Sequence, residues 1–98
     1  MKVYIAGKIT NNPDYINQFA EAEEELKASG HTVLNPVKDK GFSYKDCIDM
    51  GLCELMKCDG IYMLDGWEDS RGARLEYLYA SVTGMVIVEQ KLTGKKDE

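Results

Sequence analysis

The sequence lacks any apolar run long enough to cross a membrane or to form the core of a signal peptide. The first apolar run ends at Gly7, whereas a membrane span needs about 20 apolar residues. We therefore expect a cytoplasmic protein with no membrane partner.

Cysteine and histidine are also scarce. Cys47, Cys53 and Cys58 are odd in number and show no C-x-x-C spacing, and His31 is the only histidine. This set does not make a zinc site or a disulfide framework. The sequence therefore predicts buried free thiols, no metal site and no cofactor.

Basic residues are outnumbered, because 12 Lys and Arg face 17 Asp and Glu, which gives a net charge of −5. Binding to polymeric nucleic acid depends on neutralising phosphates, so this balance argues against such a partner. A small anionic ligand stays compatible with the composition, because a few local donors can hold one phosphate. The glycine patterns of a P-loop and of a dinucleotide-binding turn are both absent.

The length of 98 residues allows one compact domain, which we place at residues 1–92, followed by a polar, frayed tail at 93–98. With 44% apolar and 30% charged residues the chain is typical of a globular protein. A chain this short buries only a modest fraction of its surface. A homodimer or a higher homo-oligomer is therefore expected.

Apolar runs and helical spacing alternate along the chain. Strands are predicted at 2–6, 32–34, 60–64 and 85–88, and helices at 13–29, 44–57 and 72–83. Asn12 and Ser43 are the expected caps of the first two helices, and Gly30 and Gly84 end the first and third. In the first helix a spacing of three or four residues separates Ile16, Phe19, Glu23 and Leu26. In the second helix the side chains expected to face inward are Ile48, Leu52, Leu55 and Met56.

This alternation predicts an α/β fold, a small Rossmann-like or flavodoxin-like parallel sheet of about four strands flanked by three helices. The expected strand order is 2-1-3-4. Ligands of such sheets bind beyond the carboxyl ends of the strands, where the strand order reverses. The candidate crevice is thus lined by the loops at 7–12 and 65–72.

The first of these loops contains Gly7, Lys8, Ile9 and Thr10. Its backbone N–H groups and Lys8 are candidates to bind one phosphate or a sugar. The alternative is a tight turn after a strand with a solvated lysine.

Glu76 is the main candidate for chemistry, about one turn into the third predicted helix. Helical side chains lean toward the N-terminus, so its carboxylate is expected to point over the small residues Gly72 and Ala73 into open space facing the crevice. The positive end of the helix dipole favours the ionised form that a nucleophile needs. The alternative is a surface glutamate paired with Arg74 or Lys8.

Three stretches together resemble one family of proteins. They are Tyr4-Ile5-Ala6-Gly7, Gly30-His31-x-Val33-x-Asn35-Pro36, and Cys58-Asp59-Gly60-Ile61-Tyr62-x-Leu64-x-Gly66-Trp67-Glu68-x-Ser70-Arg71-Gly72-Ala73-x-x-Glu76. Over about residues 3–88 the chain is similar to small bacterial and phage proteins of the nucleoside 2-deoxyribosyltransferase-like superfamily. That superfamily also includes 2′-deoxynucleoside 5′-monophosphate N-glycosidases.

The resemblance implies cleavage or transfer at an N-glycosidic bond by a carboxylate nucleophile on a helix. The family's G-x-x-x-E pattern falls on Gly72 and Glu76. A carboxylate beside C1′ suits an oxocarbenium-like transition state and can form a glycosyl-enzyme, which water or a second base then discharges with retention.

One position departs from the family pattern. The characterised enzymes carry an acid eight positions before the Asp that precedes the third strand, and here Gly51 stands eight positions before Asp59. Asp49 and Asp46 are the nearest acids and are candidates to protonate the base or hold the sugar, with solvated helix acids as the alternative. Asp59 itself is expected to be structural, at the opposite end of the sheet.

Trp67 and Asn35 are further candidate ligand contacts. Trp67 either stacks on a nucleobase or packs in a subunit interface, to which the second or third helix would also contribute. Asn35 either binds ligand or serves its Asn-Pro turn.

Ser70 bears on the choice between a nucleoside and its 5′-monophosphate. The position six residues before Glu76 is often Asp in transferases of free nucleosides, and Ser70 resembles the monophosphate-specific relatives. A helix N-terminus and Lys8 favour a phosphate there, whereas the alternative gives Ser70 only a capping role.

Three functions follow as hypotheses. The first is an enzyme acting at the N-glycosidic bond of a 2′-deoxynucleotide or nucleoside. The second is a non-catalytic nucleotide-binding protein that kept the crevice without the second carboxylate. The third is an interaction protein whose Trp67 loop serves assembly alone.

Overall fold

A four-stranded, all-parallel sheet forms the centre of the molecule, with strand order β2-β1-β3-β4. The structure, a computed structural model, describes residues 1–37 and 44–90, and only the backbone of residues 44–48. The strands are β1 (Lys2–Ala6), β2 (Thr32–Leu34), β3 (Gly60–Met63) and β4 (Val86–Glu89). The predicted fold class and strand order are confirmed.

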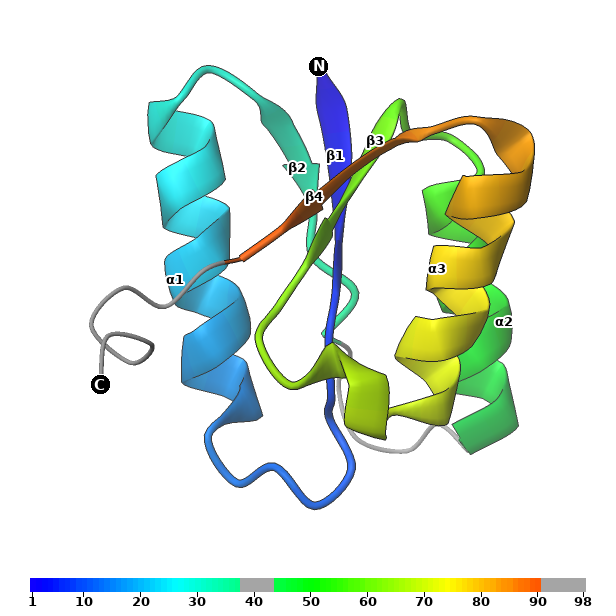
Figure 1. Cartoon of the computed structure of the whole chain (residues 1–98). Coiled ribbons are helices and arrows are strands. Elements are labelled where there is room, and N and C mark those ends of the chain that lie inside the picture. The colour runs from blue at the N-terminus through cyan, green and yellow to red at the C-terminus, as the bar shows by residue number, and fades with distance from the viewer. Residues whose placement is uncertain (38–43, 91–98) are drawn as a thin grey trace, which may run out of the picture.

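Helices cover both faces of the sheet. On one side lies α1 (Tyr15–Ala28), and on the other α2 (Tyr44–Leu55) and α3 (Arg71–Thr83) lie together (Figure 1). A short 3-10 helix, η1 (Trp67–Asp69), precedes α3. Because β1 and β3 are the central strands, both of their faces are covered, which is why these strands are nearly all apolar.

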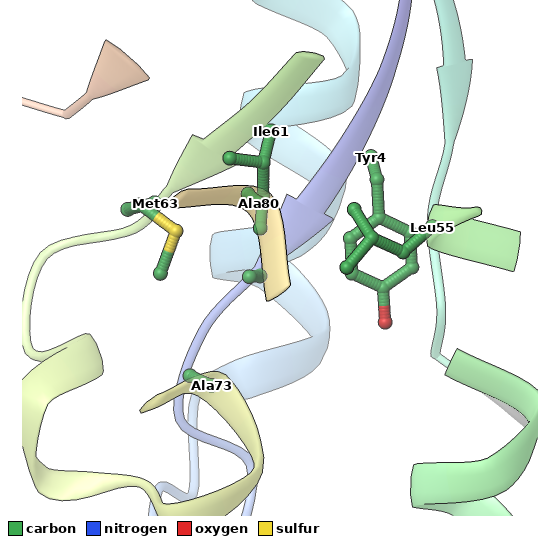
Figure 2. Close-up of a cluster of buried hydrophobic side chains, with 7 residues drawn as sticks. Tyr4, Leu55, Ile61, Met63, Ala73 and Ala80 are labelled. Carbon is green, nitrogen blue, oxygen red and sulfur yellow. The ribbon is translucent and has the colours of Figure 1, made fainter. Parts of the chain in front are cut away.

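The alternation of side chains along β1 divides the core into two layers. Tyr4 and Ala6 face α2 and α3, whereas Ile5 faces α1. The first layer is formed by Tyr4, Ala6, Leu55, Ile61, Met63, Ala73 and Ala80 (Figure 2), and the second by Ile5, Phe19, Ala22 and Leu64.

The residues predicted to cap the two ends of α3 do so in the structure. Ser70 is the N-cap residue, and its Oγ accepts the N–H of Ala73 at 3.1 Å. Gly84 ends the helix in the left-handed conformation, with φ of 79°. Gly30, which follows α1, also has the left-handed backbone conformation, with φ of 93°.

The start of α1 differs from the prediction. The helix begins at Tyr15, and the side chain of the N-cap residue Asp14 accepts no helix N–H but the side-chain amide of Asn17 at 3.0 Å. The Asn12 side chain instead donates to the Lys8 carbonyl at 2.8 Å and to Gln18 Oε1 at 2.9 Å, so it stabilises the loop after β1.

Two predicted burials are wrong. Met56 is 61% exposed, because α2 ends at Leu55 and Met56 lies on the turn that follows. Ile16 is 58% exposed, whereas Phe19 and Ala22 of the same helix are buried. Cys53 is exposed, whereas Cys58 is half-buried and its thiol donates to the Glu54 carbonyl at 3.4 Å. The Ser43 cap, the side chains of Cys47 and Ile48 and the tail at 93–98 lie outside the described residues.

Asp59 has the expected structural role at the amino end of the sheet. Its carboxylate accepts the Lys2 N–H at 3.1 Å, and its own N–H donates to the Lys2 carbonyl at 2.8 Å. No helix in the described part of the chain is long and apolar enough to span a membrane.

Candidate functional site

A hollow of about 470 Å³ lies beside the loop after β1 and the N-terminus of α3. Its lining residues are Lys8, Thr10, Asn11, Asp69, Ser70 and Arg71. Two of these side chains are cations and one is an anion, so the lining carries a small positive excess in a protein of net charge −5. The hollow is at the point where the strand order reverses between β1 and β3.

Local packing holds the two loops of this hollow together. Gly7 lies against Leu64, where a Cβ would stand 2.9 Å from Leu64 Cδ1 and 3.0 Å from Leu64 Cβ, so a larger residue would require Leu64 or the loop to shift. The Leu64 N–H donates to the Ala6 carbonyl at 2.8 Å, and Gln18 Nε2 donates to the Asp65 carbonyl at 3.2 Å. These contacts hold the loop after β1 close to the segment that follows β3.

Glu76 lies deeper in the molecule than the sequence analysis expected. It is 8% exposed, and its Oε2 accepts the Tyr4 hydroxyl at 2.7 Å. The residues that line the hollow do not include Glu76, Gly72 or Ala73. The alternative of a surface glutamate paired with Arg74 is wrong, since Glu76 is buried and Arg74 donates to the Glu68 carbonyl at 3.3 Å.

Burial controls the charge of this pair. It raises the pKa of Glu76 to about 7, opposed by the Tyr4 hydrogen bond, which lowers it, and assisted by the carboxylate of Glu54. Burial also raises the pKa of Tyr4, helped by the neighbouring Glu76, so Tyr4 is a neutral donor. Burial thus outweighs the Tyr4 hydrogen bond, and the pKa of Glu76 lies near neutral pH.

Gly51 on α2 faces the same pair. A Cβ at this position would stand 2.6 Å from Tyr4 Oη and 2.8 Å from Glu76 Oε2. The position at which the family pattern has an acid is therefore in contact with the candidate carboxylate. Glycine at this position leaves room for the hydrogen bond between Tyr4 and Glu76.

Sequence reasoning missed Tyr4 and Glu54 as members of this group. Glu54 follows Gly51 by three positions on α2, which puts both residues on one helix face. Glu54 is half-buried, and its charge raises the pKa of both Tyr4 and Glu76. The three-residue spacing from Gly51 was a signal that could have indicated Glu54.

The remaining candidates divide into those at the hollow and those elsewhere. Lys8, Thr10 and Ser70 line it, whereas Ile9 is 37% exposed in the same loop. Asp49 is an exposed residue of α2. Asp46 belongs to α2, and its side chain lies outside the described residues.

Asn35 and Trp67 are engaged within the chain. Asn35 donates to Glu23 Oε1 at 3.0 Å and accepts the Val37 N–H at 3.0 Å, as its turn requires. The Trp67 ring stacks on Tyr77 with 4.8 Å between centroids, so one ring face is already covered. Among the described residues, no group of three His, Cys, Asp or Glu side chains is placed to hold a metal ion.

Comparisons with known proteins agree with this architecture. The family model described as "Domain of unknown function (DUF4406)" matches residues 1–89. The fold is similar to a 2-deoxyribosyltransferase from the psychrotolerant bacterium Bacillus psychrosaccharolyticus, with a TM-score of 0.70 and 18% identity over 98% of this chain and 79% of that chain. No curated protein matches the chain.

Proposed function

Because the chain belongs to the DUF4406 family and shares the fold of a 2-deoxyribosyltransferase, we propose that it cleaves or transfers at the N-glycosidic bond of a 2′-deoxynucleoside or its nucleotide. The observation that carries the proposal is the buried Glu76 carboxylate, bonded to Tyr4 at 2.7 Å and with a pKa that burial raises to about 7. A buried carboxyl group with such a pKa is costly for stability, and groups of this kind concentrate at functional sites.

In the proposed reaction Glu76 is the nucleophile. Tyr4 holds Oε2, so Oε1 attacks C1′ of the sugar as the bond from C1′ to the base nitrogen breaks. The bonding electrons leave with the base, which takes up a proton from solvent water, and a glycosyl-enzyme ester forms. Water or a second base then attacks C1′ from the opposite side, releases Glu76, and gives net retention.

The hollow supplies the proposed place for the rest of the substrate. Ser70 precedes Glu76 by six residues, or about 9 Å along the helix axis. A sugar lying along the first turns of α3 would have C1′ at Glu76 and its 5′ substituent near Lys8, Ser70 and Arg71. This arrangement supports a 5′-monophosphate substrate over a free nucleoside.

The test is base release from a panel of deoxynucleosides and their 5′-monophosphates, separated by chromatography. Glu76→Gln keeps the shape of the buried side chain and removes the nucleophile, so we expect base release to fall at least about a thousandfold. Glu24→Gln, the same substitution at an exposed position of α1, is the control and should release base like the parent. Equal rates in the Glu76→Gln variant and the parent would remove the mechanism.

Gly51 stands beside Glu76 and supplies no second carboxylate. This favours one second candidate, a nucleotide-binding protein without turnover. In that case nucleotides would raise the thermal unfolding temperature without any base release. If no nucleotide stabilises the protein and no base is released, the hypothesis of an interaction protein is favoured.

A further inference from the structure

The space that an acidic side chain at position 51 would need is already filled. Gly51 has no side chain, and its Cβ would stand 2.6 Å from Tyr4 Oη and 2.8 Å from Glu76 Oε2. An acidic residue would therefore begin inside the hydrogen-bonded pair of Tyr4 and Glu76 and would have to displace it. The pair as it stands excludes a second catalytic acid at this position.

The described neighbours of Glu76 do not take over the role of that acid. The Tyr4 hydroxyl donates to Glu76 Oε2 at 2.7 Å, and burial raises the pKa of Tyr4, so Tyr4 is a poor proton donor to a base. Glu54 acts as a negative charge, because it raises the pKa of both Tyr4 and Glu76. Within residues 1–37 and 49–90, the ionisable side chains that shift the pKa of Glu76 are these two, a neutral donor and an anion.

Without a protein acid, the charge of the base decides how it leaves the sugar. An ordinary base leaves as an anion that takes its proton from water, whereas a base with a fixed positive charge leaves as a neutral molecule. Negative charge in the site stabilises the oxocarbenium-like sugar in both cases, but it destabilises an anionic base. Glu54 therefore favours a base that leaves in the neutral form.

We propose that the preferred substrates are 2′-deoxynucleotides whose base carries a fixed positive charge, such as purines alkylated at N7, because position 51 supplies no proton to the departing base. The proposal rests on the proposed function and specifies its substrate class. Glu76 Oε1 bonds to C1′ as the bond from C1′ to the base nitrogen breaks, and the electron pair of that bond neutralises the ring. Water then attacks C1′, Glu76 leaves as the carboxylate, and one proton goes to solvent.

The distribution of charge agrees with such a substrate. The hollow beside the N-terminus of α3 presents the cations Lys8 and Arg71, which suit the phosphate of a nucleotide. Around Glu76 the described ionisable groups are the neutral Tyr4 and the negative Glu54. A nucleotide with an anionic phosphate at one end and a cationic base at the other matches both ends of this arrangement.

The test compares base release from N7-methyl-2′-deoxyguanosine 5′-monophosphate and from its unmethylated parent nucleotide. Release by the Glu76→Gln variant is subtracted from each rate, because it includes the spontaneous reaction. General acid catalysis contributes about 10²–10⁴-fold, so kcat/KM should be at least about a hundredfold higher for the methylated nucleotide. Equal values for the two nucleotides overturn this proposal alone. No release from either nucleotide overturns the proposed function as well.

The methyl group also weakens the glycosidic bond by itself, so a variant must separate this effect from that of the protein. Glu54→Gln removes a negative charge that acts on Glu76 and should lower the ratio of the two kcat/KM values by about two- to tenfold. A change in the pKa of Glu76 cancels from this ratio, since both nucleotides react with the same carboxylate. Glu21→Gln, at an exposed position of α1, is the control and should keep the ratio of the parent. An unchanged ratio in Glu54→Gln overturns the proposal.

Asp46 of α2, whose side chain lies outside the described residues, needs its own variant. If Asp46 were a general acid, Asp46→Asn would slow release of the unmethylated base by at least about a hundredfold and spare the methylated one. The ratio of the two kcat/KM values would then rise, and the proposal would be overturned. We expect no such rise.

Discussion

The Tyr4 hydroxyl donates a 2.7 Å hydrogen bond to Glu76 Oε2 and so joins the first strand to the last helix across 72 positions of the sequence. The bond favours the ionised carboxylate, and burial opposes it. The balance between these two effects sets the charge of Glu76 near neutral pH, and the following predictions test it.

Tyr4→Phe removes the donor and should raise the pKa of Glu76 further. Hydrogen bonds to charged groups contribute about 1.5–3 kcal/mol, which corresponds to about one to two pH units. The acid limb of the pH–rate profile for base release should move up by that amount. Tyr62→Phe is the control, because Tyr62 lies on β3 without a bond to Glu76. An unmoved profile would show that Tyr4 does not control this carboxylate.

Glu76 should also make stability depend on pH. The ordinary pKa of a glutamate is 4.5, and the pKa of Glu76 in the folded protein is about 7, so folding is favoured while the group is protonated. This contribution is complete below pH 4.5 and is lost as the pH rises to about 7, a change of about 3 kcal/mol.

Glu76→Gln cannot ionise and should escape this loss. Urea unfolding of both proteins at several pH values measures the effect, because every other group titrates in both. The variant should gain stability relative to the parent between about pH 5 and about pH 7, by about 3 kcal/mol at most. A difference that is constant with pH would contradict the prediction.

Glu54→Gln should lower the pKa of Glu76, because the charge of Glu54 raises it. The acid limb of the pH–rate profile would then move to lower pH, opposite to the effect of Tyr4→Phe. Glu21→Gln, an exposed acid on α1, changes the net charge equally and should leave the profile in place.

Gly51→Ala should disturb the pair directly. Its Cβ would stand 2.6 Å from Tyr4 Oη and 2.8 Å from Glu76 Oε2, so the variant should lose about 1–3 kcal/mol of stability despite the better helix propensity of alanine. The cost should be smaller in a Tyr4→Phe background, where the nearer contact is gone. Additive costs in a double-mutant cycle would argue against the contact.

Ligand preference tests the hollow. A deoxynucleoside 5′-monophosphate should bind roughly ten- to several-hundredfold more tightly than its nucleoside, as one or two charge-assisted hydrogen bonds imply. Ser70→Asp keeps a capping oxygen but adds a negative charge, and should remove the preference. Arg74→Ala is the control, since Arg74 is in the same turn of α3 but does not line the hollow. Equal affinities of the parent protein for the nucleoside and for its 5′-monophosphate would contradict a phosphate site in the hollow.

The fold was predictable because its signals are local. The apolar runs of β1 and β3, the Ser70 cap and the glycines after α1 and α3 each act within a few residues. The strand order followed from the rules of connection between such elements.

The geometry of the site was less predictable, because it depends on contacts between distant segments. The spacing around Glu76 predicted open space above Gly72 and Ala73, yet the carboxylate is bonded to a tyrosine of the first strand. From the sequence, Gly51 was notable only because it stands where the family pattern has an acidic residue. Its contact with Tyr4 and Glu76 depends on how α2 packs on β1 and α3, which no local pattern contains.

The two buried alanines of α3 in Figure 2, Ala73 and Ala80, have a consequence for reactivity although they carry no functional group. They lie before and after Glu76 on the face that meets the sheet, and they act as spacers that set how far the helix axis stands from β1. A larger residue at either position would lift the helix and lengthen the Tyr4–Glu76 bond. The pKa of Glu76 thus depends on the size of two side chains, Ala73 and Ala80, that have no ionisable group of their own.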